Sequence, residues 1–354
     1  VSKDPDSREL EALMATGEQI SIALFAIACR DRGAPAISLT GPQAGIYADD
    51  RHTRSTITAI KPDKIRAELK AGKIVAVAGF QGLNAKADIT TLGRGGSDLS
   101  AVALAAVLKA EGCEIFTDVK GVYTADPRIV ADARKLPFIS YEEMLELAAS
   151  GAQVMQARSV EVARRFGVRI HVRSAFHDVP GTWIVPAKEI SMEEAVVSSL
   201  ALDKGEVRLS IVEVPDRPGI AADVLARLAE RDIPADMIVQ SAPTHAGVND
   251  ISFMTPRSFA AQAKAALESL AGELKAKRVD IHEQVAKVTV VGTGFRRHAK
   301  VAARVFGVLA KNGINIQMIS TSDLKISCVV DQKHAEPALK ALHKAFHLSR
   351  GGRR

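Results

Sequence analysis

Apolar and polar residues follow patterns that predict helices and strands in alternation along the first half of the chain. Six apolar residues recur at helical spacing near the start: Leu10, Leu13, Met14, Ile20, Leu24 and Ile27. Short apolar runs typical of strands follow at 36–39, 74–79, 113–117 and 168–172, and helical patterns at 65–69, 99–110, 141–149 and 159–166 separate them. Strands that alternate with helices predict a covered, mostly parallel α/β sheet.

Two of these elements carry sharper local predictions. The run at 74–79 is apolar without a break, which predicts a parallel strand that is covered on both faces. Ser140 and Glu143 have the spacing of a capping box and predict the start of the helix at 141–149.

The second half of the chain contains an internal repeat of the order βαββαβ. In the first copy, strands are expected at 208–214, 236–240, 250–254 and 278–283, with helices at 220–231 and 259–270. In the second, strands are expected at 287–292, 315–321 and 325–330, with helices at 301–312 and 335–346. The second copy is one strand short. We expect the apolar stretch at 195–202 to supply it, so that the two small domains interlock.

A glycine loop at 91–98 (TLGRGGSD) joins a predicted strand to a predicted helix. Glycines let the backbone approach an anion, and the helix N-terminus offers unpaired N–H groups. Arg94 adds a guanidinium that suits a carboxylate. Ser97 and Asp98 lie where an N-cap is expected, so simple helix capping is the alternative interpretation.

A second loop follows the strand at 113–117 and contains Thr117, Asp118 and the stretch 121–128 (GVYTADPR). Ligands of open α/β sheets gather at the carboxyl ends of strands. Tyr123 could stack on a base and Arg128 could meet a phosphate. A plain surface loop, interrupted by Gly and Pro, is the alternative.

Composition narrows the class of protein. The net charge is +6 and aromatic residues make up only 4%, and no basic block with interleaved aromatics indicates nucleic-acid binding. The longest apolar run, 20–29, is too short to span a membrane, and no secretory signal opens the chain. Cys29, Cys113 and Cys328 lie far apart in apolar segments, which predicts reduced core residues in a cytoplasmic protein.

Three phrases together resemble the aspartate kinases: 92–98, Thr117-Asp118 with 121–128, and 319–322 (ISTS). The resemblance extends over essentially the whole chain. It implies an amino-acid-kinase α/β/α sandwich with a mostly parallel sheet, incomplete at its N-terminus, followed by two C-terminal ACT-like βαββαβ domains. The composition changes near Pro180-Gly181 and Pro186. We expect the kinase domain at 1–185, a linker with the donated strand at 186–204, and the ACT domains at 205–284 and 285–350.

The resemblance also implies roles for individual residues. Those expected at the substrate aspartate are Glu18, Thr40, Arg94, Gly95, Gly96, Ser97 and Asp98, of which Arg94, Ser97 and Asp98 are the expected catalytic residues. Those expected at the nucleotide are Thr117, Asp118, Tyr123, Asp126, Arg128 and Gln153. Those expected at a regulatory site are Asp216, Gly219, Gln240, Asn249, Asp250, Ser320 and Thr321.

The implied reaction is transfer of a phosphoryl group from ATP to the β-carboxylate of L-aspartate, the first step towards lysine, threonine and methionine. The β-carboxylate is already ionised at neutral pH, so no strong general base is needed. Catalysis would depend on positioning and on neutralising the transferred group, with Mg²⁺ supplying part of the charge. No metal ligand from the protein itself is expected.

The sequence departs from the family pattern at three places. The family opens with a Lys-x-Gly-Gly loop that this sequence lacks, and Val1 stands where translation places Met. We therefore expect a chain that starts inside a longer protein, or at a start codon translated literally, with little turnover by itself. Gln153 replaces a lysine common near the nucleotide, and His298-Ala299-Lys300 replaces His-Pro-Gly.

Two other functions stay open at the level of the sequence. A non-catalytic amino-acid-sensing subunit with a degenerate kinase fold is the alternative, and a kinase for a different acidic substrate is a third possibility. The expected partners are aspartate, ATP and a feedback amino acid, threonine or lysine. The expected assembly is a homodimer through the ACT domains, with a heterotetramer containing a short regulatory subunit as the alternative. Neither nucleic acid nor a membrane is expected as a partner.

Overall fold

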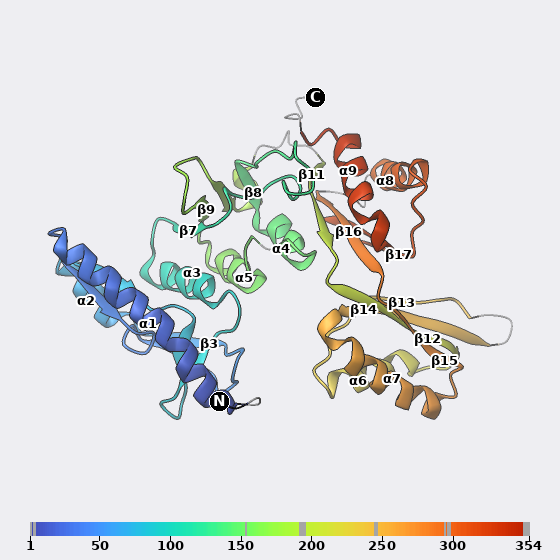
Figure 1. The fold of residues 1–354 in the computed structure, drawn as a ribbon, viewed down its shortest axis with the longest axis horizontal. Helices are drawn as coiled ribbons and strands as arrows, with labels where there is room; N and C mark the ends of the chain where they lie inside the picture. Colours follow the sequence, from blue (N-terminus) through green and yellow to red (C-terminus); the bar gives the residue numbers. More distant parts are fainter. Residues whose placement is uncertain are drawn as a thin grey trace. The chain divides into compact units, whose positions relative to one another are not determined.

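The computed structural model describes residues 2, 5–152, 154–190, 196–243, 247–293, 295 and 299–349 of the 354-residue sequence. The chain forms two compact units (Figure 1). The first contains Val1–Val122, Lys135–Ala148 and Gln153–Met192, and the second contains Tyr123–Arg134, Ala149–Ala152 and Glu193–Arg354. The segment Tyr123–Arg134 thus belongs to the second unit, although the residues on both sides of it belong to the first.

The first unit has the predicted α/β class. Its helices are α1 (Ser7–Asp31), α2 (Asp63–Lys70), α3 (Gly96–Leu108), α4 (Tyr141–Ala149) and α5 (Ala157–Phe166). Its strands are β1 (Ala36–Leu39), β2 (Ile46–Ala48), β3 (Ile57–Ile60), β4 (Ile74–Val77), β5 (Gln81–Leu83), β6 (Ile89–Thr91), β7 (Cys113–Thr117), β8 (Phe138–Ser140), β9 (Ile170–Ser174) and β10 (Thr182–Val185). They form sheets ordered β1-β4, β7-β9-β10-β8 and β3-β2-β5-β6.

Parallel pairing prevails in two of these sheets. β1 pairs with β4, β7 with β9 and β8 with β10 in parallel, and only β9 and β10 run antiparallel. The third sheet was not predicted, because its strands are only three or four residues long and show no readable alternation. It leads directly into the glycine loop, since the N–H of Leu92 donates to the carbonyl of Phe80 at 2.9 Å.

The two local predictions have opposite outcomes. The capping box is confirmed, because the N–H of Ser140 donates to Glu143 Oε2 at 3.3 Å and the N–H of Glu143 donates to Ser140 Oγ at 3.2 Å. The prediction that strand 74–79 is covered on both faces is wrong. Ile74 is 44% exposed and the rest of β4 is only partly buried. Among the described strands β4 pairs with β1 alone, so its other edge has no strand beside it.

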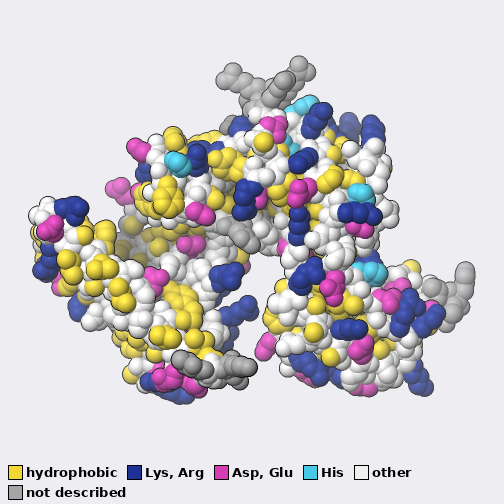
Figure 2. All heavy atoms as spheres, in the orientation of Figure 1, with side chains coloured by type: hydrophobic (Ala, Val, Ile, Leu, Met, Phe, Trp, Pro, Cys, Tyr) yellow, Lys and Arg dark blue, Asp and Glu magenta, His cyan; other side chains and the backbone are white. Residues whose placement is uncertain are grey.

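Helix α1 runs without a break through Gly17-Glu18 and is longer than its apolar run. It packs against β1, β4 and β6, yet Leu13, Leu24 and Ile27 are each more than 60% exposed. Figure 2 shows hydrophobic side chains gathered over this helix. By length and composition α1 could cross a membrane, and it is the one described helix that could. A single such helix near the N-terminus is weak evidence, and its packing on three strands assigns it to the α/β fold.

The second unit contains two four-stranded sheets with paired helices. Its helices are α6 (Ile220–Ala229), α7 (Ala260–Leu274), α8 (Ala299–Lys311) and α9 (Ala335–Ala345). Its strands are β11 (Val197–Asp203), β12 (Glu206–Pro215), β13 (Asp236–Gln240), β14 (Val248–Pro256), β15 (Arg278–His282), β16 (Val285–Gly292), β17 (Met318–Thr321) and β18 (Lys325–Asp331). The sheets are ordered β13-β14-β12-β15 and β11-β16-β18-β17. Each sheet with its two helices corresponds to one copy of the predicted repeat.

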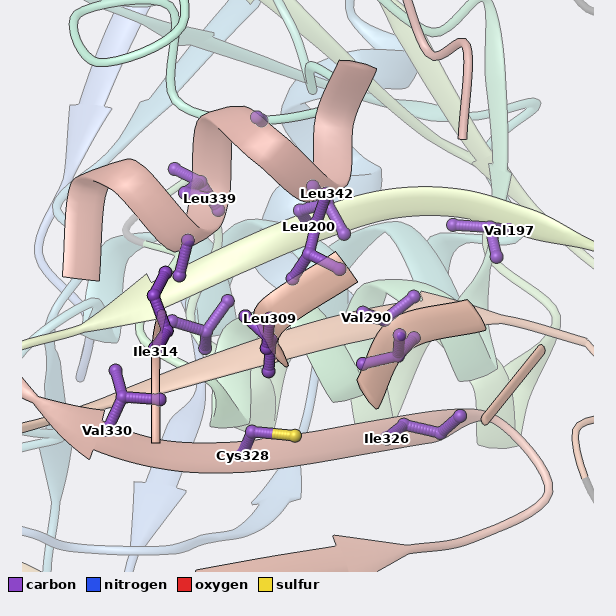
Figure 3. Packing of buried hydrophobic residues seen from close by; sticks show 14 of the residues in the cluster. Val197, Leu200, Val290, Leu309, Ile314, Ile326, Cys328, Val330, Leu339 and Leu342 are labelled. Atoms are coloured by element: carbon purple, nitrogen blue, oxygen red, sulfur yellow. The ribbon is translucent and has the colours of Figure 1, made fainter. Parts of the chain in front are cut away.

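Strand β11 precedes the first repeat in the chain but pairs antiparallel with β16 in the sheet of the second (Figure 1). Its inward-facing residues enter a continuous apolar core. Figure 3 shows Val197 and Leu200 of β11 packed with Leu309, Leu339 and Leu342 from α8 and α9. Ala125 and Val130 join the same cluster. The segment Tyr123–Arg134 is therefore built into the core of the second repeat.

Polar contacts hold the segment Tyr123–Arg134 to α9 and also join the two sheets of the second unit. Thr124 is fully buried and its Oγ1 lies 3.0 Å from His343 Nε2 of α9. Between the sheets, Lys287 of β16 is 2% exposed and its Nζ lies 2.8 Å from Glu206 and 3.1 Å from Asp236. Burial by itself would lower the pKa of Lys287, but the two carboxylates outweigh it and raise that pKa. A buried lysine between two carboxylates thus joins the two repeats.

Candidate functional site

The glycine loop turns directly from β6 into α3. Gly95 is the N-cap of α3 with φ 71°, a left-handed conformation that favours glycine, and no side chain caps the helix. The helix begins at Gly96, so Ser97 and Asp98 already lie in its first turn. The alternative that these two residues cap α3 is therefore wrong. The N–H of Gly96 donates to the carbonyl of Gly93 at 2.9 Å, whereas the N–H groups of Ser97 and Asp98 have no acceptor among the described residues, as an anion site requires.

The loop is packed too tightly for side chains at its glycines. A Cβ on Gly95 would lie 2.5 Å from Gln156 Cγ, and one on Gly96 would lie 2.9 Å from Leu92 Cβ. A Cβ on Gly93 would lie 2.8 Å from the carbonyl oxygen of Thr53. The backbone course of the loop is therefore fixed by its neighbours on several sides.

Three polar side chains project from this backbone. Arg94 and Ser97 are exposed, and neither makes a hydrogen bond or ion pair with any other described residue. Asp98 is mostly buried, and burial raises its pKa, while a hydrogen bond from the N–H of Gln156 opposes the rise. An unpaired guanidinium and a desolvated carboxylate therefore stand within four residues of each other at an uncapped helix N-terminus.

Glu18 and Thr40, the other residues expected at the substrate, are on segments joined by Gln81. Gln81 is fully buried on β5, and its Nε2 donates to the carbonyl of Ala15 in α1 at 3.3 Å. Its Oε1 accepts from the N–H of Gly41 at 3.4 Å. Both Glu18 and Thr40 are partly exposed. Gln81 could not be singled out from the sequence, because a lone glutamine in a three-residue strand gives no pattern.

A second residue missed by the sequence analysis is Glu11 of α1, which is fully buried. Its Oε1 accepts from the N–H of Thr53 at 2.6 Å, and from the N–H and Oγ1 of Thr91 at 2.9 and 2.7 Å. Its Oε2 makes a hydrogen bond with His52 Nδ1. Burial would raise the pKa of Glu11, but these hydrogen bonds outweigh it and hold that pKa below its usual value.

The residues expected at the nucleotide fall in both units. Thr117 is the last residue of β7 in the first unit and Asp118 follows it, and Thr117 Oγ1 donates to Asp118 Oδ1 at 3.1 Å. Tyr123, Asp126 and Arg128 belong to the second unit. Arg128 donates to Asp126 through its N–H at 2.9 Å and through Nη2 at 2.8 Å, which holds the pKa of Asp126 below its usual value. Gln153 lies outside the described residues.

A hollow of about 480 Å³ opens at the N-terminus of α6. It is lined by Asp216, Arg217, Pro218, Gly219, Ile220, Ala221, Ala222 and Gln240. Gly219 is the N-cap with φ 98°, no side chain caps the helix, and a Cβ there would meet nothing within 4 Å. Three residues expected at the regulatory site therefore share this hollow: Asp216, Gly219 and Gln240.

The other residues expected at the regulatory site lie around or apart from the hollow. Asn249 of β14 is buried, and its Nδ2 donates to Asp216 Oδ1 at 2.8 Å, while its Oδ1 is buried without a partner in the described structure. Asp250 accepts from the N–H of Glu213 at 2.9 Å. Ser320 and Thr321 are on β17, in the sheet of the second repeat.

The described residues of the two units form no evident metal cage. No group of three or more His, Cys, Asp or Glu side chains able to hold a metal ion occurs in the described parts of the chain. Cys29, Cys113 and Cys328 are all free, and burial raises the pKa of Cys113 to about 11 and that of Cys328 to about 12. The thiols of Cys113 and Cys328 are therefore poor nucleophiles and poor metal ligands at neutral pH.

Two family models match the chain. The model of the amino acid kinase family matches residues 2–174, and the model of an ACT domain matches residues 288–346. The first match covers α1, the glycine loop and β9. The second covers most of the sheet and both helices of the second repeat.

Known proteins resemble the chain over nearly all of its length. The aspartate kinase of Stutzerimonas stutzeri (strain A1501) is 47% identical over 348 residues, which are 98% of this chain and 84% of that protein. The structure of E. coli aspartokinase III in complex with aspartate and ADP (R-state) has a TM-score of 0.81 at 28% identity and covers 97% of this chain and 77% of that one. The structure of the same enzyme in complex with lysine and aspartate (T-state) has a TM-score of 0.75 at 27% identity, with the same coverage.

Proposed function

The chain belongs to the aspartate kinase family, and we propose that its glycine loop, residues 92–98, is the site that holds L-aspartate. The observation that carries the proposal is the uncapped N-terminus of α3, where the exposed Arg94 has no partner among the described residues. A helix N-terminus and a free guanidinium both attract a carboxylate. The E. coli relative with the same fold was solved with aspartate bound.

The substrate offers two carboxylates and one ammonium group to this site. We assign the α-carboxylate to Arg94, whose planar guanidinium can bind it at two points. We assign the ammonium to Asp98 and Glu18. Burial disfavours the ionised form of Asp98, so a positive group beside it would stabilise that form strongly. Ser97 and the N–H of Gly95 would then face the β-carboxylate, which is the nucleophile, while Gly96, whose N–H donates to the carbonyl of Gly93, would leave room for it.

The nucleotide is the phosphoryl donor in this proposal. The E. coli relative binds ADP, and the enzyme class requires a nucleotide. We assign Thr117 and Asp118, at the carboxyl end of β7, to the nucleotide, together with Tyr123, Asp126, Arg128 and Gln153 from the family resemblance. Magnesium usually binds through substrate phosphates and one or two carboxylates. The described residues contain no three-ligand cluster, so we expect Mg²⁺ to enter with ATP.

The hollow at α6 is the proposed effector site. A free amino acid carries a carboxylate, which suits the uncapped N-terminus of α6, and an ammonium, which suits Asp216. The buried and unpartnered Oδ1 of Asn249 beside Asp216 adds an acceptor for the same group. One E. coli structure contains lysine. We propose lysine or threonine as the effector here, with Gln240 contacting its side chain and Asp250, Ser320 and Thr321 in supporting positions.

The assembly and the compartment are proposed on the same basis. We expect a homodimer formed through the two repeats, in which Ile238, Val239 and Ile319 expose apolar surface on strands β13 and β17. We place the enzyme in the cytoplasm, since its three free cysteines fit a reducing compartment.

Replacing Arg94 with Ala tests the aspartate site. Loss of the guanidinium would leave the substrate carboxylate unpaired and cost ~2–4 kcal/mol in substrate and transition-state binding. Calorimetry with L-aspartate, and hydroxamate trapping of aspartyl phosphate with ATP and Mg²⁺, measure the two effects. Aspartate affinity of Arg94→Ala equal to that of the unaltered chain would overturn the assignment.

A further inference from the structure

Glu11 occupies an unusual position for an ionised side chain. It is fully buried, and it lies far from the glycine loop in the sequence. A buried carboxylate is stable only when donors satisfy its oxygens. Oε1 has three donors, the N–H groups of Thr53 and Thr91 and the hydroxyl of Thr91, and Oε2 has His52.

These donors lie on the two segments that hold the start of the glycine loop. Thr91 is the last residue of β6, and Leu92 and Gly93 follow it directly. Thr53 has φ 65°, a left-handed conformation that costs energy in a threonine, and its carbonyl packs against Gly93. Glu11 thus stabilises the strained residue that contacts the loop and the strand residue from which the loop starts.

The guanidinium of Arg158 binds the same two segments, which contain Thr53 and Thr91. Arg158 of α5 donates from Nη1 to the carbonyl of Leu92 at 3.0 Å and from Nη2 to the carbonyl of Ser55 at 2.9 Å. The N–H of Ser55 in turn donates to the carbonyl of Thr91 at 3.0 Å. The segment 53–55 and the stretch 91–93 are therefore bound to each other and clamped between a buried anion and a guanidinium.

We propose that Glu11 is a positioning residue for the aspartate site, which sets the placement of Arg94 through Thr91, Thr53 and Gly93. The inference rests on the proposed function of the glycine loop. Without the carboxylate, the N–H and hydroxyl of the buried Thr91 and the N–H of Thr53 would lack their acceptor, and the chain around 53 and 91 would shift to satisfy them. Arg94, one residue beyond Gly93, would lose its fixed position, and positional errors of this kind reduce binding steeply.

The shape of the contact predicts which substitution is tolerated. Oε1 carries three of the four hydrogen bonds, and the amide oxygen of a glutamine accepts in the same way. Glu11→Gln therefore keeps the hydrogen bonds to Thr53 and Thr91 and removes the negative charge. Glu11→Ala removes both the hydrogen bonds and the charge. A role that depends on geometry separates these variants, and a role that depends on negative charge does not.

The test is the affinity of the full chain for L-aspartate, measured by calorimetry with folding checked by circular dichroism. We expect Glu11→Ala to weaken binding about tenfold or more and Glu11→Gln to stay within about threefold of the unaltered chain. Thr91→Val, which removes one donor and keeps the side-chain shape, should fall between them and serves if Glu11→Ala does not fold. Glu68→Gln is the matched control, because Glu68 of α2 is a carboxylate with a single cation partner, Lys73.

The outcomes separate this inference from the proposed function. Unchanged affinity in Glu11→Ala, or in Thr91→Val if Glu11→Ala does not fold, with a weakened Arg94→Ala overturns the positioning role alone. Equal weakening in Glu11→Gln and Glu11→Ala overturns it as well, because charge and not geometry would then matter. If the unaltered chain binds no aspartate, or if Arg94→Ala binds it as well as the unaltered chain does, both the proposed function and the inference fail.

Discussion

Two helix N-termini in this chain have the same local design and different surroundings. The helices α3 and α6 each start after a left-handed glycine, Gly95 and Gly219, and neither has a side-chain cap. A Cβ on Gly95 would meet Gln156 at 2.5 Å, whereas a Cβ on Gly219 would meet nothing within 4 Å. The first terminus is enclosed by its own unit, and the second opens into a hollow of about 480 Å³.

The difference matches two kinds of work. Phosphoryl transfer depends on atoms held in place, and a loop fixed on several sides provides such a position before the substrate arrives. An effector has only to be present or absent, and an open hollow lets it enter and leave without rearranging a core. The proposed anion-binding element is therefore closely packed in the kinase half and open in the repeat half.

The largest expected effect comes from filling the enclosed terminus. Gly95→Ala forces a Cβ against Gln156 and keeps an alanine in a left-handed conformation, which together cost about 2–4 kcal/mol of stability. Trp183, the chain's only tryptophan, lies on β10 in the first unit, so its fluorescence during denaturant unfolding reports this loss. Gly72→Ala is the control, because Gly72 has φ 73° and open space around it. Equal losses in both variants would contradict the crowding argument.

The next effect concerns the ligand of the open terminus. Asp216→Ala removes the carboxylate that faces the hollow and accepts from Asn249, and a charged hydrogen bond is worth about 1.5–3 kcal/mol. Binding of lysine or threonine to the full chain should weaken about tenfold or more, while aspartate affinity stays the same. Calorimetry with each amino acid measures both. Effector affinity that survives the change would exclude the hollow as the effector site.

Filling the open terminus should cost less. Gly219→Ala meets no atom within 4 Å, so only the left-handed conformation opposes it, at about 1–2 kcal/mol. The loss should appear in the far-ultraviolet circular dichroism of the repeat half. The Trp183 fluorescence transition of the first unit should not move. A loss as large as that of Gly95→Ala would remove the distinction between the two termini.

The smallest effect is a pH dependence at the enclosed terminus. Burial raises the pKa of Asp98 in the fold above its unfolded value, so the folded state binds the proton more tightly. The stability of the first unit should therefore fall as pH rises from the ordinary carboxyl range through the folded pKa, and then level off. Asp98→Asn should remove this slope from the Trp183 transition, while weakening aspartate binding. A slope that persists in the variant would assign the pH dependence to another group.

The periodic elements of the chain were predictable because their signals are local. The repeated order of strands and helices indicates two copies of one unit, and strand β13 at Asp236–Gln240 begins and ends where the pattern predicts. The capping box of Ser140 and Glu143 is likewise defined by residues within one stretch of four. In each case the interactions that decide the structure lie within a few positions along the sequence.

The parts that could not be predicted depend on contacts between distant residues. The sheet β3-β2-β5-β6 consists of strands too short to show a period. Residue preferences left capping by Ser97 and Asp98 open as an alternative, whereas in the structure the left-handed Gly95, close to Gln156, is the N-cap. Glu11 reads as an ordinary helix residue, and only its approach to Thr53 and Thr91 shows that it is buried.

Strand β11 has a consequence for the order in which the chain can fold. Because β11 precedes β12 but pairs with β16, the first repeat is an insertion between two strands of the second. On the ribosome β11 must remain without its partner until the whole first repeat has been synthesised, whereas the first repeat can close its own sheet at once. Contacts so far apart in sequence slow folding. A cut between the repeats near residue 284 would therefore separate β11 from its sheet and expose the apolar side of β16.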